Sequence, residues 1–251
     1  MLLHGRSPQR LAAVSAEIER RAGTPARTYL ADFRALAAVR CMAEEIERDQ
    51  VRLDVLVNNA GIGPGRPNAS REESDDGHEL RFAVNYLAPF LLTNLLLPLL
   101  RRSAPSRIVN VASGGQAPVD FADVMVERHY DGVRAYAQSK LALVAFTFEL
   151  AERLAAQGKA HVDVNALHPA TWMNTKMVYE SIGRTQSTIE DGVRATLPLI
   201  VDPGLKGVTG RYFNGLEEGR ARPQAYEPDA RRRLWRLSET LTGLPSAGTG
   251  R

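Results

Sequence analysis

A tyrosine and a lysine four residues apart form the sharpest chemical pattern in this sequence. Tyr136 and Lys140 stand in the stretch YAQSK, within a run whose apolar spacing predicts a helix at about residues 134–157. Residues four apart share one face of a helix, so the phenol and the ammonium group are expected to converge. A nearby cation lowers the tyrosine pKa towards a range that suits proton transfer. An ordinary surface pair is the alternative.

Two further polar residues stand where a reacting group could use them. Ser113 follows the apolar run RIVNVA, which predicts a buried strand over residues 107–112. Its hydroxyl can donate to a carbonyl oxygen, and a turn-forming serine is the alternative. Asn85 lies in FAVNYLAPF, inside a helix predicted at about residues 75–101, where asparagine is a poor helix former. A satisfied core amide is the alternative to a functional role.

The elements that must position these residues alternate along the chain. Short apolar runs predict strands at residues 1–4, 26–30, 53–58, 107–112, 161–167 and 211–213. Amphipathic periods predict helices at about 9–22, 33–50, 75–101, 134–157, 187–201 and 228–242. This alternation predicts an α/β fold, a doubly wound Rossmann-type parallel sheet with helices on both faces. Ligands of such a sheet bind beyond the carboxyl ends of the strands.

Composition narrows the class of protein. The 251 residues carry 32 basic and 29 acidic side chains, and a net charge of +3 is too small to argue for nucleic-acid binding. The length fits one domain, placed at residues 1–243, with a flexible tail at residues 244–251. The lone Cys41 favours a reducing compartment, so we expect a cytoplasmic protein in which this thiol is buried or half-buried.

Five motifs together resemble the short-chain dehydrogenase/reductase family. NNAG, FAVNYLAPF, RIVNVAS, YAQSK and VNALHPATWMNTK occur in the order and approximate spacing of that family, from the first residue to about residue 213. The resemblance implies hydride transfer between a nicotinamide cofactor and a carbonyl or alcohol. It implies that Tyr136 is the general acid/base and that Lys140 lowers the tyrosine pKa and holds the nicotinamide ribose. Ser113 would orient the substrate oxygen, and Asn85 would hold a proton-relay water.

The same resemblance gives the cofactor positions. Arg6, in HGRS after the first predicted strand, stands where NADP-binding members carry a basic residue for the 2′-phosphate, and a guanidinium suits that dianion. Asp32 resembles the aspartate beside the adenine ring. We therefore expect NADP in preference to NAD, with an exposed turn arginine as the alternative. The other cofactor-binding positions that the resemblance implies are Asn59, Ala60, Gly61, Tyr136, Lys140, Pro169 and Thr171.

The sequence departs from the family pattern after the fifth predicted strand and in the interval before Tyr136. Ala170 replaces the usual glycine, and Thr175 stands one place later than the usual threonine, so Thr171 and Thr175 are both candidates for the cofactor contact. The interval from Ser113 to Tyr136 is 23 residues, which is longer than in typical family members. The additional residues resemble those of the retinol-dehydrogenase-like branch. That branch acts on bulky apolar carbonyls and alcohols, which favours an apolar substrate.

A third departure concerns the Gly-rich cofactor loop, which in the family precedes the position of MLLHGRS by roughly 20 residues. GIGPG at residues 61–65 is no substitute, because its spacing is wrong and no helix follows to hold a pyrophosphate. We expect the central strand to be missing, which leaves unpaired inner edges on its neighbours. For these 251 residues alone, we expect weak NADPH binding and poor solubility.

Three interpretations follow from this departure. The sequence starts at an internal methionine of a working reductase, or it is a non-catalytic, truncated remnant that binds without turnover, or it is a basic interaction protein. Retention of all four proposed catalytic residues favours the first. We further expect a small-molecule substrate, no metal, no nucleic-acid partner and no membrane span. Residues 90–100 and the helix that carries Tyr136 resemble the subunit surfaces of the family, which implies a homodimer or homotetramer.

Replacing Arg6 by aspartate tests the cofactor assignment. Because a carboxylate repels a 2′-phosphate and accepts hydrogen bonds from a ribose 2′-hydroxyl, Arg6→Asp is expected to shift preference from NADPH towards NADH. The measurement is the ratio of the kcat/KM values for the two cofactors. An unchanged ratio would show that Arg6 does not select the cofactor and is an exposed turn residue.

Overall fold

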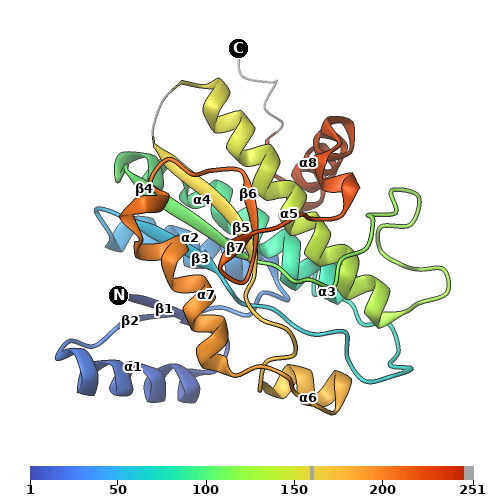
Figure 1. Cartoon of the computed structure of the whole chain (residues 1–251), viewed down its shortest axis with the longest axis horizontal. Coiled ribbons are helices and arrows are strands. Elements are labelled where there is room, and N and C mark those ends of the chain that lie inside the picture. Colours follow the sequence, from blue (N-terminus) through green and yellow to red (C-terminus); the bar gives the residue numbers. More distant parts are fainter. Residues whose placement is uncertain (159–160, 246–251) are drawn as a thin grey trace.

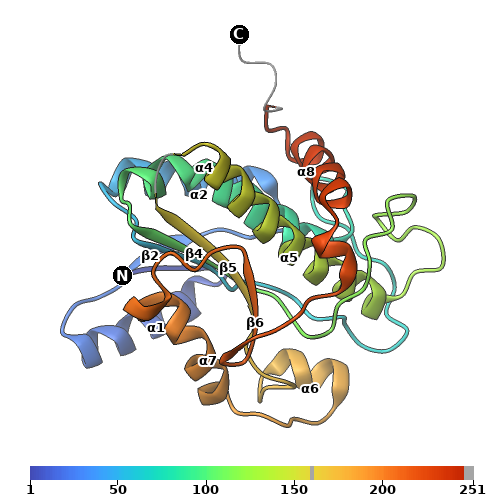
Figure 2. The ribbon, with the colours of Figure 1, turned by 45° about the horizontal axis from the view of Figure 1, so that its top comes forward.

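Parallel strands form the middle layer of the fold, and helices cover both faces (Figures 1 and 2). The computed structural model describes residues 1–158 and 161–245. One face carries α2 (Leu36–Asp49), α4 (Ala88–Arg102) and α5 (Gly132–Ala156), and the other carries α1 (Pro8–Ala22) and α7 (Ile189–Val201). The predicted α/β class is confirmed. Residues 246–251 of the predicted tail lie outside the described residues, whereas Leu244 packs against the core.

The strands form two sheets. In the first, β1 (Leu2–Gly5) pairs in parallel with β2 (Arg27–Leu30). The second has the order β3 (Val55–Asn58), β4 (Ser106–Val111), β5 (Val162–His168), β6 (Arg211–Asn214) and β7 (Glu217–Glu218), of which only β7 is antiparallel to its neighbour. Within residues 1–158 and 161–245, β1 and β3 each have a strand partner on one side only. This agrees with the expectation of two unpaired inner edges.

The helix predicted at residues 75–101 is divided. It begins at α3 (Leu80–Phe82), continues through a π-helical turn, η1 (Ala83–Leu87), and passes into α4. The late start has a local cause, because Glu79 caps the helix by accepting a hydrogen bond from the Phe82 amide. Elements that the sequence pattern did not predict are α6 (Lys176–Ile182), η2 (Pro203–Leu205), β7 and η3 (Pro223–Tyr226).

Aromatic side chains join α4 and α5 to the last helix, α8 (Pro228–Thr242). The Phe90 ring centroid lies 5.2 Å from that of Phe146 and 5.1 Å from that of Trp235, both in edge-to-face contact. This packing buries much of the surface that the sequence suggested for subunit contact. The stretch Leu80–Arg102 is long and apolar enough to cross a membrane, but 78% of its apolar window is buried inside the fold, as in a core helix.

One expectation about a side chain was wrong. Cys41 is exposed, whereas we expected a buried or half-buried thiol. The reason is its position on α2, where Val39, Met42 and Ala43 form the face that is buried in the core. Cys41 falls on the opposite side of the same helical turn.

A chain of buried polar side chains fixes the register of the second sheet. Asn58 and Asn110 are directly opposite each other on β3 and β4, and Asn58 Nδ2 donates to Asn110 Oδ1 at 2.7 Å. Asn58 also donates to Thr93 Oγ1 on α4, and Asn110 donates to Thr147 Oγ1 on α5. Because unsatisfied amides are costly in the core, this pairing disfavours other registers. It therefore holds the carboxyl ends of β3 and β4 side by side.

Truncation of Phe90 tests the aromatic contact between α4 and α8. Phe90 is completely buried, so Phe90→Ala is expected to lower the free energy of unfolding by about 3–5 kcal/mol through lost contacts and a cavity. Urea unfolding measures the change, and Leu216→Ala, at a position 61% exposed, is the control. Equal effects of the two substitutions would show that α8 does not depend on this contact.

Candidate functional site

The carboxyl ends of β3 and β4 meet the N-terminal half of α5, and the four proposed catalytic residues come together there. Ser113 lies two residues beyond β4, and Tyr136 and Lys140 lie in the first turns of α5. Lys140 Nζ is 5.8 Å from the centroid of the Tyr136 ring and donates to the backbone oxygen of Val111 at 3.0 Å. The predicted convergence on one helix face is therefore observed.

Asn85 joins this site to the loop that follows β3. Its side chain is completely buried, and its Oδ1 accepts from the Ile62 amide at 2.8 Å. Its Nδ2 donates to the Ile62 carbonyl and to Ser139 Oγ on α5, both at 3.0 Å. The side chain is thus a satisfied core amide that sits in a π-helical turn, a local form found often at functional sites. Its part in holding a relay water stays a prediction.

Gly61 leaves the space that this arrangement needs. A Cβ atom at this position would lie 3.1 Å from Asn85 Oδ1 and 3.6 Å from Lys140 Nζ. A side chain at this position would therefore crowd the Asn85 amide, whereas its Cβ would be in ordinary contact with the Lys140 amine. Of the neighbours that the sequence suggested for cofactor binding, Ala60 is half-buried and Asn59 is exposed.

Burial dominates the electrostatics of the site. Burial lowers the pKa of the Lys140 amine to about 8, and no charged group opposes that effect. Burial also raises the pKa of the Tyr136 phenol, and a hydrogen bond with the Ser113 side chain acts in the opposite direction. The expected lowering of the tyrosine pKa by Lys140 is therefore not seen in this structure. The reason is that both groups lose water together when α5 is buried.

The residues suggested for the adenosine end lie at the ends of the first sheet. Arg6 directly follows β1 and is exposed, and the register of β1 and β2 places Gly5 opposite Leu30, two residues before Asp32. Asp32 Oδ1 accepts from the Arg34 amide at 3.0 Å. In the part of the chain that the structure describes, Arg6 has no ion-pair partner, so its guanidinium can bind an anion such as a 2′-phosphate.

Pro169 and Thr171 border a cavity of about 520 Å³ between the end of β5 and α7. The Thr171 hydroxyl lies 3.1 Å from His168 Nε2. Thr175, the other candidate, caps α6 by accepting a hydrogen bond from the Val178 amide. Thr171 is thus the threonine that faces the cavity, whereas Thr175 has a structural contact. No group of three or more metal-ligating side chains occurs in residues 1–158 or 161–245.

Two residues that the sequence patterns did not reveal hold Ser113. Gln116 Nε2 donates to the Ser113 carbonyl at 2.7 Å, and the Tyr212 hydroxyl donates to the same oxygen at 3.1 Å. Burial raises the pKa of Tyr212 to about 12, so the phenol stays protonated and remains a donor near neutral pH. Tyr212 lies on β6, in a strand motif with no chemical signature, so only the folded structure could find it.

Comparison with known proteins places the chain in a family. A family model of short chain dehydrogenases matches residues 1–184. Retinol dehydrogenase 14 of Mus musculus is 37% identical over 227 residues, which cover 85% of this chain and 66% of that protein. Retinol dehydrogenase 13 of Homo sapiens is 38% identical over 230 residues, with coverages of 85% and 67%. The crystal structure of an uncharacterised protein from Mycobacterium paratuberculosis has a TM-score of 0.75 at 29% identity, covering 96% of this chain and 83% of that one.

The chain therefore belongs to the short chain dehydrogenase family. Within the family it is similar to the retinol dehydrogenases, as its long interval before Tyr136 suggested. It spans 66% of the length of the mouse retinol dehydrogenase 14 that it matches.

The buried amine of Lys140 makes a prediction about stability and pH. Its folded-state pKa of about 8 lies below the ordinary 10.5, so the unfolded chain binds more protons between these values. The stability of the wild type relative to Lys140→Met is therefore expected to rise with pH across that window, by at most about 1.4 kcal/mol per pH unit. Urea unfolding of both proteins at a series of pH values measures the difference. A difference that stays constant from pH 8 to 10.5 would contradict the lowered pKa.

Proposed function

We propose that the protein is an NADP-dependent oxidoreductase that interconverts a carbonyl and an alcohol on a substrate with an apolar body. The observation that carries this proposal is the convergence of Ser113, Tyr136 and Lys140 beside Gly61 and Asn85 at the carboxyl edge of the parallel sheet. Ligands of doubly wound sheets bind at this edge. Bound NADPH would supply the hydride in the direction of reduction.

The side chains of the site would orient the substrate oxygen and transfer a proton to it. The Ser113 hydroxyl would donate a hydrogen bond to the carbonyl oxygen, and the Tyr136 hydroxyl would give that oxygen its proton. Protonated Lys140 would stabilise the phenolate that remains. Lys140 has three donors, and among the described residues its one hydrogen bond is that to the Val111 carbonyl, so donors remain for the hydroxyls of a ribose.

Two observations support the finer parts of the proposal. Arg6 offers an exposed guanidinium without a carboxylate partner among the described residues, and this favours NADP over NAD. The names of the relatives, retinol dehydrogenases 13 and 14, indicate an alcohol with a large apolar body for those proteins. We extend that class of substrate to this chain.

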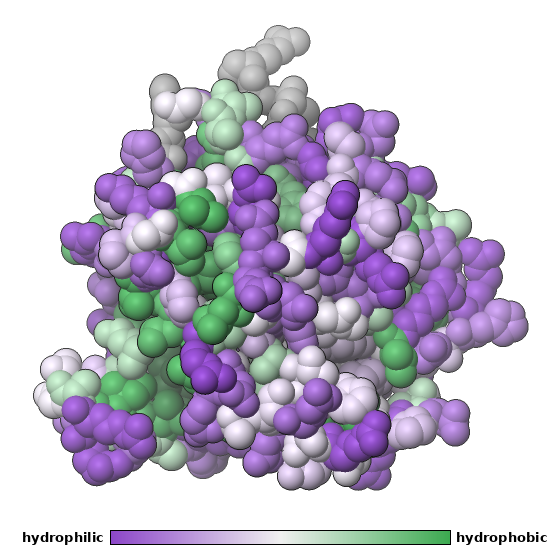
Figure 3. Space-filling view, in the orientation of Figure 1, coloured by the Kyte–Doolittle hydropathy of each residue, from purple (hydrophilic) through white to green (hydrophobic). Residues whose placement is uncertain are grey.

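A homo-oligomer belongs to the same proposal. The expected surfaces on α4 and α5 are largely covered by the chain itself, but α7 exposes an apolar stripe. Its members, spaced four residues apart, are Ile189, Val193, Leu197 and Val201. Figure 3 shows apolar side chains gathered on this face of the molecule. Such a stripe supports a subunit contact.

Removal of the Tyr136 hydroxyl tests the assigned chemistry. Tyr136→Phe keeps the ring but cannot deliver a proton, so kcat is expected to fall by about 100-fold or more while NADPH affinity stays nearly unchanged. NADPH absorbance follows turnover, and calorimetry follows binding. Tyr179→Phe, at an exposed tyrosine on α6, is the matched control. A Tyr136→Phe protein that keeps most of its activity would refute the assignment.

A further inference from the structure

The imidazole of His168 contacts two segments that carry proposed site residues. His168 is the last residue of β5, and its carbonyl accepts a hydrogen bond from the Gly215 amide at 2.9 Å, which fixes its backbone. A Cβ atom at Gly114 would lie 3.2 Å from His168 Cδ2, so the ring packs closely against the residue after Ser113. Its Nε2 atom also lies 3.1 Å from the Thr171 hydroxyl. One side chain therefore touches the segment after β4 and the segment after β5.

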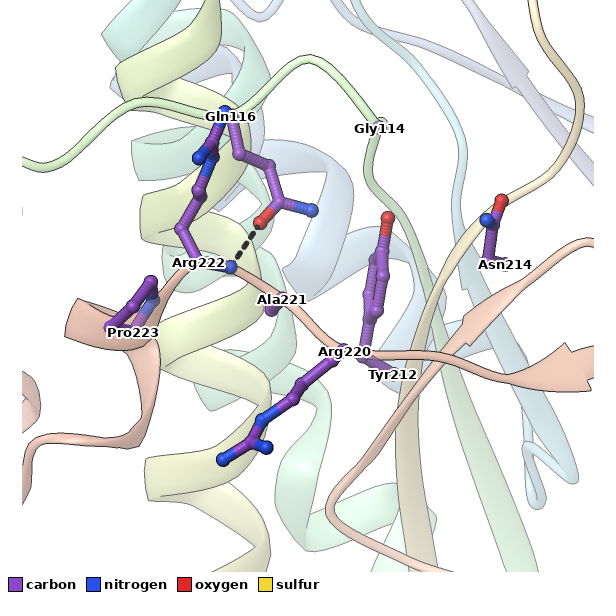
Figure 4. A pocket seen from close by; sticks show the side chains of 8 residues that line it. All are labelled: Gly114, Gln116, Tyr212, Asn214, Arg220, Ala221, Arg222 and Pro223. Carbon is purple, nitrogen blue, oxygen red and sulfur yellow. Dashed lines mark hydrogen bonds between the residues drawn. The ribbon is translucent and has the colours of Figure 1, made fainter.

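The segment after β4 connects this imidazole to the proposed general acid. The side chain of Ser113 is hydrogen-bonded with that of Tyr136. Figure 4 shows the hydroxyl of Tyr212 pointing towards the segment of Gly114, where it donates to the Ser113 carbonyl at 3.1 Å. The ring of His168 thus packs against a segment whose position is set by the residues that would bind the substrate oxygen.

The protonation state of His168 decides which atom donates in its contact with Thr171. Burial lowers the pKa of the imidazole below its ordinary 6.5, so the ring is neutral near pH 7. A neutral imidazole has one nitrogen that accepts hydrogen bonds, and this nitrogen is a stronger acceptor than a hydroxyl oxygen. The favoured arrangement is therefore donation by the Thr171 hydroxyl to Nε2. The threonine oxygen then keeps its lone pairs for another donor.

The cavity of about 520 Å³ that His168 and Thr171 both line suits an uncharged donor. Thr171 is exposed to it. Among the described residues, the charged side chains that line the cavity are Asp191 and Arg194 on α7 and Glu217 on β7. Asp191 and Arg194 form an ion pair at 2.7 Å, and Glu217 is exposed. A primary amide, whose N–H groups need acceptors, complements this wall better than an anion does.

We propose that His168 is a positioning residue that fixes the Thr171 hydroxyl as a hydrogen-bond acceptor for the amide of the nicotinamide ring. The inference rests on the proposed function, which supplies the cofactor. With its hydrogen directed to Nε2, the Thr171 oxygen presents its lone pairs to the amide N–H. Because the same ring packs against Gly114, His168 also relates the position of the amide to that of Ser113.

Two cofactors that differ in one group test the inference by binding alone. In 3-acetylpyridine adenine dinucleotide phosphate a methyl ketone replaces the amide, so the N–H donors are absent and the carbonyl remains. Calorimetry near neutral pH measures the Kd of this analogue and of NADP for the full chain. The wild type is expected to bind NADP about fivefold more tightly than the analogue. His168→Leu and Thr171→Val should each lower this ratio to about one, and His168→Gln, which restores an acceptor, should recover it.

A pH series separates this role from packing alone. Protonation turns Nε2 of His168 into a donor, so the ratio for the wild type is expected to fall as the pH drops below 6.5. In His168→Gln the ratio should stay constant, although Asp191, Arg194 and Glu217 are still present. His161→Leu, at an exposed histidine directly before β5, is the control and should keep the wild-type ratio at each pH.

The outcomes for the inference and for the proposed function can be told apart. Equal binding of the two cofactors by the wild type, or a ratio that persists in His168→Leu, would overturn the inference. A ratio that His168→Gln does not recover would also overturn it, because packing alone would then explain the loss. A ratio that depends on His168 in a protein without NADPH-dependent turnover would support the inference and reject the oxidoreductase activity. Turnover with a ratio of one would do the reverse, and binding of neither cofactor would overturn both.

Discussion

The fold depends on one buried amide that ties three distant segments together. The side chain of Asn85, in the π-helical turn, holds the backbone of Ile62 after β3 and the hydroxyl of Ser139 on α5. Ser139 lies between Tyr136 and Lys140, so the same contact sets the depth at which both side chains enter the site. Gly61 makes room for this close approach, because a Cβ atom there would lie 3.1 Å from Asn85 Oδ1. Loss of this amide would leave the backbone amide and carbonyl of Ile62 without this partner and would remove one hydrogen bond from Ser139.

Buried polar side chains also align the strands of the second sheet. The contact between Asn58 and Asn110 sets the register of β3 and β4, and Thr147 extends it to α5. The segments that carry Gly61 and Ser113 therefore leave the sheet from neighbouring strand ends. Lys140 is buried among these elements with no carboxylate partner in the described part of the chain, at a cost in stability that a structural role alone does not explain. The proposed function gives this amine a role, because it would hold the cofactor and stabilise a phenolate.

Most of the strands and helices, and part of the site, could be predicted from the sequence, because the residue patterns that mark them depend on local structure. Alternating apolar runs located six strands, and amphipathic periods located α1 and α8 to within a few residues. The convergence of Tyr136 and Lys140 needed only helical geometry. Other features depend on tertiary contacts. The division of the helix before α4, the exposure of Cys41 and the support of Ser113 by Gln116 and Tyr212 arise from packing between segments far apart in the chain. The raised pKa of Tyr136 follows from burial, which spacing does not report.

Transfer of hydrogen from the cofactor to the substrate is the most direct test of the account. The protein would be incubated with NADPH that carries deuterium at the reacting position of its nicotinamide ring, together with benzaldehyde as an apolar aldehyde, and the alcohol formed would be examined by mass spectrometry and proton NMR. The account predicts one deuterium on the carbinol carbon and a single stereochemical outcome, because Ser113 and Tyr136 fix one face of the carbonyl. An alcohol without deuterium, or no alcohol at all, would contradict the assignment of this site to hydride-transfer chemistry.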